Sequence, residues 1–379
     1  MRDLAYIARI EDLKPIEGKD RIELAAVAGW EVIVEKNRYN IGDLVVYAEY
    51  DTILPANNPN FEFLRKRCYS KTYDGFRIRN MTMAGHVSQG IVFPLSILPP
   101  EAKARSVYKE GTSVAALLGI RKYDPEALRE EERLQRKKNK NKLFKLLMKN
   151  KLFKKTYLYF ITPVSRPYPK TVAKADEMNI QKLFDEYKAN DTEHDFYYVT
   201  EKLEGQAAVY MLHKNKYMFF SHNVDMTKAG NSNWQYISDK YKMKDKLKEA
   251  KKLYRRQFAI MGEIVGPGIQ KNIYKFPDKE FFVYKIVDTD TGLALEFDEL
   301  QTVTNALGLT MVPILEPKIT LDSFKTISDV LEYSNGPSVF KEAPMREGVV
   351  FRHVYDQRIG FKAKSPKYLI WWDKKDITE

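Results

Sequence analysis

The sequence predicts an α+β protein with a small N-terminal β-barrel, a basic connector and a larger second domain of strands and helices. Three observations lead to this prediction. The chain has 379 residues, and at roughly 150 residues per domain this length favours two domains. Residues 1–100 hold short β-rich segments separated by turn residues, and beyond residue 166 strands alternate with helices. We therefore expect domains at 1–100 and 166–379, joined by a connector at 101–165.

The first domain contains a row of short predicted strands. Turn residues such as Gly18, Gly29, Gly42 and Gly75 fall between them. This spacing is typical of a small all-β barrel. We interpret it as an oligonucleotide-binding (OB) barrel, with a different small barrel as the alternative. The predicted strands are Leu4–Ile10, Ile22–Val27, Trp30–Val34, Leu44–Tyr50, Phe76–Arg79 and Gly90–Phe93.

The connector is strongly cationic. From Arg133 to Lys155 it carries eleven Lys or Arg residues and no acidic residue. Apolar residues between Leu143 and Met148 favour a basic amphipathic helix, so we expect a partly helical linker. The segment Asn-Lys-Leu-Phe-Lys repeats at Asn141 and Asn150, about two and a half turns apart, which argues against one continuous amphipathic face. A solvated linker and an element that follows phosphates are equally favoured, and a membrane-surface segment has less support.

The second domain alternates strands with helical segments and shows no obvious repeat. We expect an α+β domain built on antiparallel sheets. The strongest predicted strands are Phe196–Thr200, Ala207–Leu212, Tyr217–Ser221, Phe258–Ile264, Phe281–Val287, Gly348–Phe351 and Ile359–Lys362.

Composition limits the class of protein and its partners. Hydrophobic residues make up 44% of the chain and aromatic residues 13%, enough for a substantial core. The 63 Lys and Arg exceed the 51 Asp and Glu by twelve, and a net charge of +12 favours a polyanion such as nucleic acid as partner. Cys68 is the one cysteine, which excludes an internal disulfide. No apolar run reaches the roughly 18 residues of a membrane span, and the N-terminus lacks the hydrophobic segment of a signal peptide, so we expect a soluble, intracellular protein. We expect it to be a monomer.

Several common site types are not indicated. The sequence has no Gly-x4-Gly-Lys-Ser/Thr loop for a nucleotide triphosphate. Its five histidines lack metal-ligand spacing, and no Gly-x-Ser-x-Gly elbow suggests a serine nucleophile.

Four short motifs follow one another in the second domain. Each alone is weak, since charged motifs at strand ends are usually solvated turns. Their joint occurrence in one order is much more specific. The motifs are Lys202-Leu203-Glu204-Gly205, Gly262-Glu263, Glu347-Gly348-Val349-Val350 and Lys362-Ala363-Lys364.

This ordered set resembles the motifs of the covalent nucleotidyltransferases, which include ATP-dependent ligases and mRNA capping enzymes. Residues 262–270 and 361–368 are most similar to RNA ligases. Residues 1–100 resemble the OB domain that one nick-sealing branch of RNA ligases carries in front of the transferase domain. The resemblance covers about 1–100 and 176–370, and it implies an ATP-grasp-like DNA/RNA ligase fold for the adenylyltransferase domain.

The resemblance also implies roles for individual residues. Lys202 would attack the α-phosphorus of ATP, with Glu204, Lys362 and Lys364 as the other catalytic residues. The residues that it assigns to the nucleotide are Gln181, Lys202, Gly205, His222, Glu263, Tyr284, Glu347, Lys362 and Lys364.

These residue types suit that chemistry. A lysine nucleophile must be neutral, although its ordinary pKa is about 10.4. Positive charge on Lys362, Lys364 and a divalent cation would disfavour the ammonium form and neutralise the reacting phosphates. Glu204, Glu263 and Glu347 supply the oxygen ligands that Mg²⁺ or Mn²⁺ prefers. The alternative for each carboxylate is an ordinary ion pair with a surface Lys or Arg.

Two positions need separate comment. The family stacks an aromatic residue on adenine, and the pattern aligns Tyr284 with it, although Tyr284 could equally be part of the core. His222 stands where relatives have an arginine, and a neutral imidazole would contact a ribose or phosphate more weakly. Lys228 is an alternative source of that contact.

The expected function is an ATP-dependent RNA ligase that joins a 3′-OH to a 5′-phosphate through lysyl-AMP and RNA-adenylate, in RNA repair by nick sealing. The expected partners are ATP and RNA ends or nicked duplex RNA, with no membrane. The alternatives are a GTP-dependent mRNA capping guanylyltransferase and a non-catalytic RNA-binding protein with a degenerate transferase domain. Fifteen residues follow Lys364, too few for the C-terminal OB domain of DNA ligases and capping enzymes.

Overall fold

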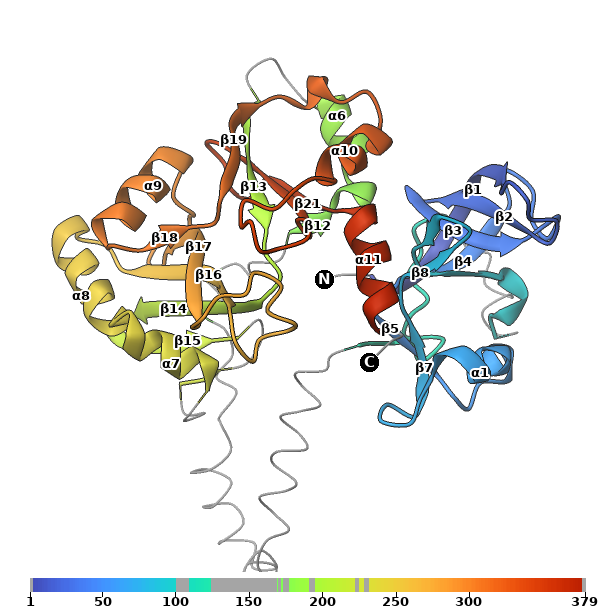
Figure 1. The fold of residues 1–379 in the computed structure, drawn as a ribbon, viewed down its shortest axis with the longest axis horizontal. Helices are drawn as coiled ribbons and strands as arrows, with labels where there is room; N and C mark the ends of the chain where they lie inside the picture. The colour runs from blue at the N-terminus through green and yellow to red at the C-terminus, as the bar shows by residue number, and fades with distance from the viewer. Residues whose placement is uncertain are drawn as a thin grey trace, which may run out of the picture. The chain divides into compact units, whose positions relative to one another are not determined.

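The chain divides into two compact units, residues 1–137 with 369–379 and residues 138–368 (Figure 1). The computed structural model describes residues 3–99, 109–123, 169, 172, 177–190, 195–221, 225–227 and 232–376. The predicted basic helix of the connector, His222 and Lys228 lie outside these residues. Across the described ranges, no helix has the length and apolar character to cross a membrane.

The N-terminal unit is built on a five-stranded antiparallel sheet. Five of the six strands predicted for this region lie in it, and the sixth, Phe76–Arg79, corresponds to a strand of a second sheet. The order of the five-stranded sheet is β10-β4-β1-β2-β3. Side chains alternate along β1, so that Ala5 and Ile7 enter one hydrophobic cluster while Tyr6 and Ala8 enter another. The strands are β1 (Ala5–Pro15), β2 (Ile22–Val27), β3 (Trp30–Glu35), β4 (Leu44–Ala48) and β10 (Ile91–Pro94).

A smaller second sheet, of order β11-β5-β7-β6, completes the core of this unit. Residues 109–123, which composition assigns to the connector, contribute Val114, Leu118 and Ile120 to the same core. The remaining elements are β5 (Thr52–Pro55), η1 (Pro59–Leu64), α1 (Arg65–Cys68), β6 (Tyr69–Ser70), β7 (Gly75–Ile78), β8 (Met81–Met83), β9 (His86–Ser88), η2 (Leu95–Ile97) and β11 (Arg121–Lys122).

The C-terminal unit contains two five-stranded sheets, of order β12-β21-β20-β13-β19 and β15-β14-β16-β17-β18. All pairs are antiparallel except β12 with β21 and β17 with β18. The predicted α+β class is confirmed. The first sheet contains β12 (Met178–Asn179), β13 (Tyr197–Lys202), β19 (Ile314–Ile319), β20 (Gly348–His353) and β21 (Gly360–Lys364). The second contains β14 (Gln206–His213), β15 (Lys216–Phe220), β16 (Phe258–Val265), β17 (Glu280–Asp288) and β18 (Thr310–Met311).

Helices cover one face of each sheet, as Figure 1 shows for α7, α8 and α9 on the second sheet. Helix α6, η3 and α10 pack in the same core as the first sheet. The opposite faces are thereby left for the functional site. The helices are η3 (Ile180–Lys182), α6 (Phe184–Asn190), α7 (Asn233–Lys240), α8 (Met243–Tyr254), α9 (Phe297–Ala306), η4 (Leu321–Ser323), α10 (Ile327–Ser334) and α11 (Pro366–Asp376).

Strand alternation decides which side chains reach those faces. In β21, Phe361 and Ala363 enter the core with the helices, so Lys362 points the other way. In β13, Val199 enters the same core, which turns Thr200 and Lys202 to the opposite face.

Candidate active site

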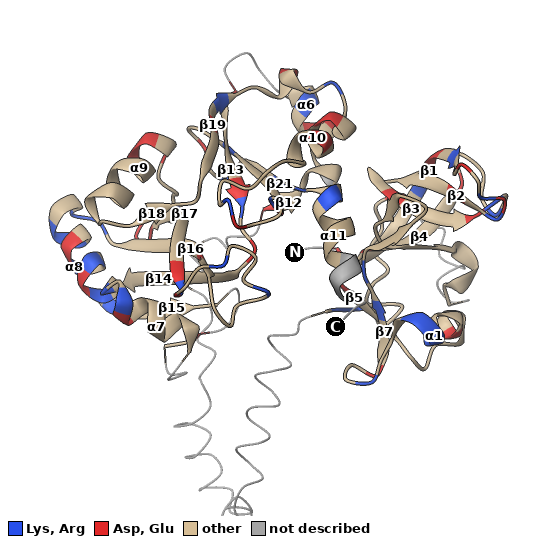
Figure 2. Cartoon of the chain, viewed as in Figure 1, with Lys and Arg blue, Asp and Glu red and all other residues tan. Residues whose placement is uncertain are grey.

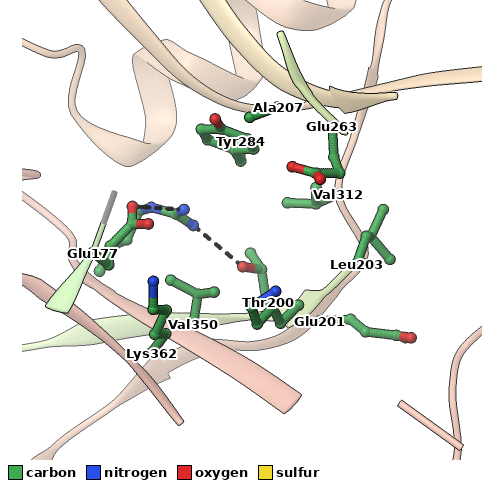
Figure 3. Close-up of a pocket in the computed structure, with 12 residues that line it drawn as sticks. Glu177, Thr200, Glu201, Leu203, Ala207, Glu263, Tyr284, Val312, Val350 and Lys362 are labelled. Atoms are coloured by element: carbon green, nitrogen blue, oxygen red, sulfur yellow. Dashed lines mark hydrogen bonds and ion pairs between the residues drawn. The ribbon is translucent and has the colours of Figure 1, made fainter. Parts of the chain in front are cut away.

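A cavity of about 140 Å³ lies between the two sheets of the C-terminal unit (Figure 3). The first sheet contributes Thr200, Lys202, Val350, Arg352 and Lys362 to its lining, and the second sheet contributes Ala207, Glu263 and Tyr284. Charged side chains of both signs therefore line one small space. Apolar residues such as Val350 and Ala207 complete the lining, and a cavity that combines apolar walls with convergent polar groups is a candidate small-ligand site.

Lys202 ends β13 and forms an ion pair at the cavity. Its Nζ lies 2.7 Å from Oε2 of Glu347, and the two side chains are 21% and 9% exposed. The other oxygen of Glu347 lies 3.8 Å from Nζ of Lys364. Glu347 is thus held between the first and the last of the four motifs.

Gly348 explains how Glu347 comes so close to Lys364. A Cβ atom on Gly348 would lie 2.2 Å from the carbonyl oxygen of Ala363 and 2.9 Å from Cα of Lys364. No side chain fits there, so a glycine is required for β20 to pair with β21 at this register.

Glu204 is a buried carboxylate whose two oxygens have no hydrogen-bond partner among the described residues. Burial raises its pKa to about 8, and the nearby charge of Glu347 acts in the same direction, against Lys202, Lys271 and Lys364. An unpartnered buried carboxylate is costly in a folded protein. A bound cation would relieve that cost, because it favours the ionised form.

Backbone contacts fix the turn that carries Glu204. Its amide donates a 2.6 Å hydrogen bond to the hydroxyl of Tyr274. At Gly205, a Cβ atom would lie 2.4 Å from the carbonyl oxygen of Ile264 and 2.8 Å from Cγ of Glu263. The glycine therefore lets the Lys-x-Glu-Gly turn pack directly on the Gly-Glu strand.

A β-bulge directs Tyr284 to the cavity. Met261 pairs with Lys285 and Gly262 pairs with Val283, so Tyr284 is the extra residue of β17. Bulges of this kind re-aim side chains beside active sites. Figure 3 shows Tyr284 and Glu263 on the wall that faces Lys362.

Two charged residues of the cavity were not predicted from the sequence. Arg352 is 3% exposed and Glu177 is 15% exposed, and they form an ion pair at 2.8 Å. The Arg352 guanidinium also lies 5.3 Å from the ring centre of Tyr284. Burial opposes ionisation of Glu177, but the charges of Arg352, Lys285 and Lys362 hold the pKa of Glu177 below its ordinary value. Arg352 lies in β20, the strand that carries the Glu-Gly-Val-Val motif. Its place in that strand is the sequence feature that could have identified it as a site residue.

Comparison with known families supports the two-part organisation. Residues 4–95 match a family of OB-fold domains, and residues 195–368 match the RNA ligase family. The matched RNA ligase segment contains Lys202, Glu204, Glu263 and Glu347. This segment is therefore similar to RNA ligases.

Solved structures of RNA ligases share the whole fold. Naegleria gruberi RNA ligase in an apo variant matches with a TM-score of 0.78 and 25% identity, covering 100% of this chain and 99% of that chain. Another variant of that enzyme, with AMP and Mn, matches with the same TM-score and identity over 98% and 100% of the chains. Its structure with PPi covers 100% of both chains, again at 0.78 and 25%. No curated protein sequence matches the chain.

Most of the predicted site residues of the RNA ligase segment meet at or beside the cavity. Lys202, Glu263, Tyr284 and Lys362 line it. Glu347 contacts Lys202, and Lys364 contacts Glu347. The pKa of Glu204 depends on the charges of these three residues.

Three predictions are not reflected in this geometry. Gln181 lies in η3 and does not line the cavity, and His222 falls outside the described residues. The third concerns the predicted metal ligands Glu204, Glu263 and Glu347: in the described part of the chain, no group of three His, Cys, Asp or Glu side chains is placed to hold a metal ion. Because Mg²⁺ usually takes only one or two carboxylates and completes its shell with water and phosphate oxygens, such a cluster is not required.

Proposed function

We propose that this protein is an ATP-dependent RNA ligase that joins a 3′-OH to a 5′-phosphate through lysyl-AMP and RNA-adenylate. The observation that carries the proposal is the contact of Lys202 with Glu347, beside the unpartnered carboxylate of Glu204, in a cavity that Tyr284 also lines. The match of residues 195–368 to the RNA ligase family supports the reaction class. The Naegleria gruberi structures with ATP and Mn support the nucleotide and the divalent metal.

In the first step, Nζ of Lys202 would attack the α-phosphorus of ATP. A nitrogen–phosphorus bond forms, the bond to the bridging oxygen breaks, and pyrophosphate leaves in line with the attack. The amine must lose its proton, and the contact with Glu347 orients it before the nucleotide arrives. Lys362 and Lys364 would neutralise charge that develops on the phosphate oxygens.

The carboxylates present fit a divalent cation. The carboxylate oxygens of Glu204 are buried and have no hydrogen-bond partner among the described residues, and Glu347 lies near enough to raise the pKa of Glu204. Bound there with the phosphates, Mg²⁺ or Mn²⁺ would supply positive charge that lowers the cost of bringing an anionic triphosphate to this site. Glu204 and Glu347 would hold it, and Glu263 would contact the nucleotide across the cavity.

The later steps would use RNA ends. An oxygen of the 5′-phosphate would attack the phosphorus of lysyl-AMP, so that a phosphoanhydride bond forms, the nitrogen–phosphorus bond breaks and the amine of Lys202 is released. The 3′-OH of the second end then attacks the 5′-phosphorus, and AMP leaves. The OB-fold domain and the net charge of +12 would bind the RNA backbone. Nicked duplex RNA is the substrate that we propose, in an RNA repair role.

A chase experiment tests the pathway. Protein labelled with α-³²P ATP and Mg²⁺ is separated from nucleotide and mixed with nicked duplex RNA that has a 3′-OH and a 5′-phosphate. Label should leave the protein, pass through adenylated RNA and end as AMP while the nick is sealed. Joining of single strands should be slower, and equal rates would contradict the nicked-duplex substrate.

The two rival functions give different outcomes in the same assay. A capping guanylyltransferase would take label from GTP rather than ATP. A non-catalytic RNA-binding protein would bind RNA and take no label from either nucleotide. The RNA ligase family match favours the ligase over both.

A further inference from the structure

Glu177 uses only one carboxylate oxygen in the ion pair that holds it. Nε and Nη2 of Arg352 both contact Oε1 of Glu177, at 2.9 and 2.8 Å. The remaining Nη1 of Arg352 donates to Oγ1 of Thr200 at 3.3 Å. In the described part of the chain, no other residue donates a hydrogen bond to Oε2 of Glu177.

The carboxylate of Glu177 borders the same cavity as the aromatic ring that would stack on a base. Glu177, Tyr284 and Lys362 all line this space, and Figure 3 shows them around it. The ion pair with the buried Arg352 restrains the carboxylate, because two nitrogens of one guanidinium both hold Oε1. A stacked base would therefore meet a rigid hydrogen-bond acceptor at its edge.

An ionised carboxylate accepts hydrogen bonds and cannot donate them. The pKa of Glu177 is held below its ordinary value, so this side chain is ionised near neutral pH. A 6-amino purine presents N–H donors at position 6, whereas a 6-oxo purine presents an acceptor there. The 6-amino group would donate a charge-assisted hydrogen bond to the carboxylate. A 6-oxo group would place its own acceptor oxygen against the carboxylate oxygen, and no hydrogen bond could form.

We propose that Oε2 of Glu177, locked in place by Arg352, accepts a hydrogen bond from the 6-amino group of the nucleotide and selects ATP over 6-oxo purine nucleotides. The inference rests on the proposed function, since it concerns the nucleotide of the first step. It assigns Glu177 a role that the four motifs do not include. Arg352 is a positioning residue in this arrangement.

A series of nucleotides tests the proposal on the unaltered protein. Self-nucleotidylation is measured with α-labelled ATP, with purine riboside triphosphate, which has hydrogen at position 6, and with inosine triphosphate, which has oxygen there. Loss of one hydrogen bond to a charged group should lower the efficiency with purine riboside triphosphate by about 10- to 100-fold. Inosine triphosphate should be poorer still.

The failure of this inference differs from failure of the proposed function. If ATP and purine riboside triphosphate label the protein with equal efficiency, the role of Glu177 is refuted while the ligase proposal stands. If no nucleotide labels the protein, the proposed function itself fails.

A substitution gives an independent readout. In Glu177→Gln the amide can both accept and donate, so the preference for ATP over inosine triphosphate should fall at least about tenfold. Glu186→Gln, an exposed change in α6, is the matched control and should keep the preference. An unchanged preference in folded Glu177→Gln protein would overturn the proposal. The thermal midpoint monitors folding, because this change removes the charge partner of buried Arg352.

Discussion

Nζ of Lys202 lies 2.7 Å from Oε2 of Glu347, and Nζ of Lys364 lies 3.8 Å from the other oxygen of the same carboxylate. Glu347 thus interacts with two amines, one from the first of the four motifs and one from the last. Before nucleotide binds, this contact favours the ammonium form of Lys202. Adenylylation therefore requires that the phosphates and the cation replace part of that interaction.

Replacing Glu347 with glutamine should separate two effects of this carboxylate: it positions Lys202 and Lys364, and it stabilises the cationic form of Lys202. The amide keeps the shape but not the charge, so the positions of Lys202 and Lys364 should loosen and the maximal rate of self-adenylylation should fall by about 10²-fold. The rising limb of the pH–rate profile should also move to lower pH, because the amine is no longer stabilised as a cation. Rapid-quench labelling across pH 6–10 measures both.

Glu332→Gln is the control for that variant. Glu332 of α10 forms an ion pair with Lys367 of α11, and the two side chains are 72% and 64% exposed. Its loss should leave both rate and pH profile unchanged. A profile for Glu347→Gln that coincides with the unaltered protein would contradict the assigned contact.

Glu204 should make the protein without nucleotide less stable as pH rises. Its pKa is raised from 4.5 to about 8 by burial and by Glu347. Because the pKa of Glu204 is higher in the folded protein than in the unfolded chain, the folded protein holds the proton more tightly. The resulting stabilisation is fully present below pH 4.5 and is lost as the pH rises through 8. Glu204→Gln should therefore be more stable than the unaltered protein at pH 8.5, by at most about 5 kcal/mol and with a higher Tm, and about equally stable at pH 4.5.

Metal binding should reverse this trend. Mg²⁺ binds the ionised carboxylate, so its affinity should rise with pH until Glu204 is fully ionised. Thermal midpoints with and without Mg²⁺ and a non-hydrolysable ATP analogue should diverge from pH 6 to pH 9 in the unaltered protein. Equal divergence in Glu204→Gln would remove Glu204 from the metal site.

Gly205→Ala should damage the site through the backbone. The added Cβ would lie 2.4 Å from the carbonyl oxygen of Ile264, which is rigid sheet backbone. We expect a loss of about 1–3 kcal/mol in stability and a large loss of self-adenylylation, since the Glu204 turn must move. Gly85→Ala is the control: no atom lies within 4 Å of its Cβ, although its φ of +82° adds strain of about 1 kcal/mol. Equal activity of the two variants would refute this account.

The charge of the N-terminal unit is uneven, which predicts where RNA binds. Residues 62–79 contain six basic and two acidic residues, whereas 11–38 contain five basic and seven acidic residues. Figure 2 shows Lys and Arg concentrated at α1 and mixed charges along β1 and β2. Alanine at Arg65, Lys66 and Arg67 together should weaken RNA binding and reduce its log–log salt slope by about 2–3.

The same triple variant should keep self-adenylylation at the unaltered rate, because ATP chemistry resides in the other unit. Alanine at Lys14, Lys36 and Arg38 is the matched control from the acid-rich segment and should change the salt slope less. If both triple variants reduce the slope equally, RNA binding is not localised at α1.

The sequence predicted the fold well where side chains alternate. Strand β2 was predicted with its observed bounds, because Ile22–Val27 lies between clear turns. Short strands were missed for a physical reason. Strand β12 has two residues and pairs in parallel with β21, so it carries no periodic pattern.

Prediction of the site had a similar limit. The motifs located Lys202 and Glu347, but not that the two side chains contact each other. Glu177 is separated by 175 positions from Arg352, and only the folded sheet brings the pair together. The bulge that turns Tyr284 into the cavity is likewise a property of strand register and not of the local sequence.

The most direct test of the central claim is the covalent labelling of Lys202. The protein is incubated with α-³²P ATP and Mg²⁺, denatured and digested, and the adenylylated peptide is identified by mass spectrometry. We predict a single adenylyl group on Lys202 and no label on folded Lys202→Ala or Lys202→Arg. Label on another residue, or equal labelling of the Lys202 variants, would contradict the claim.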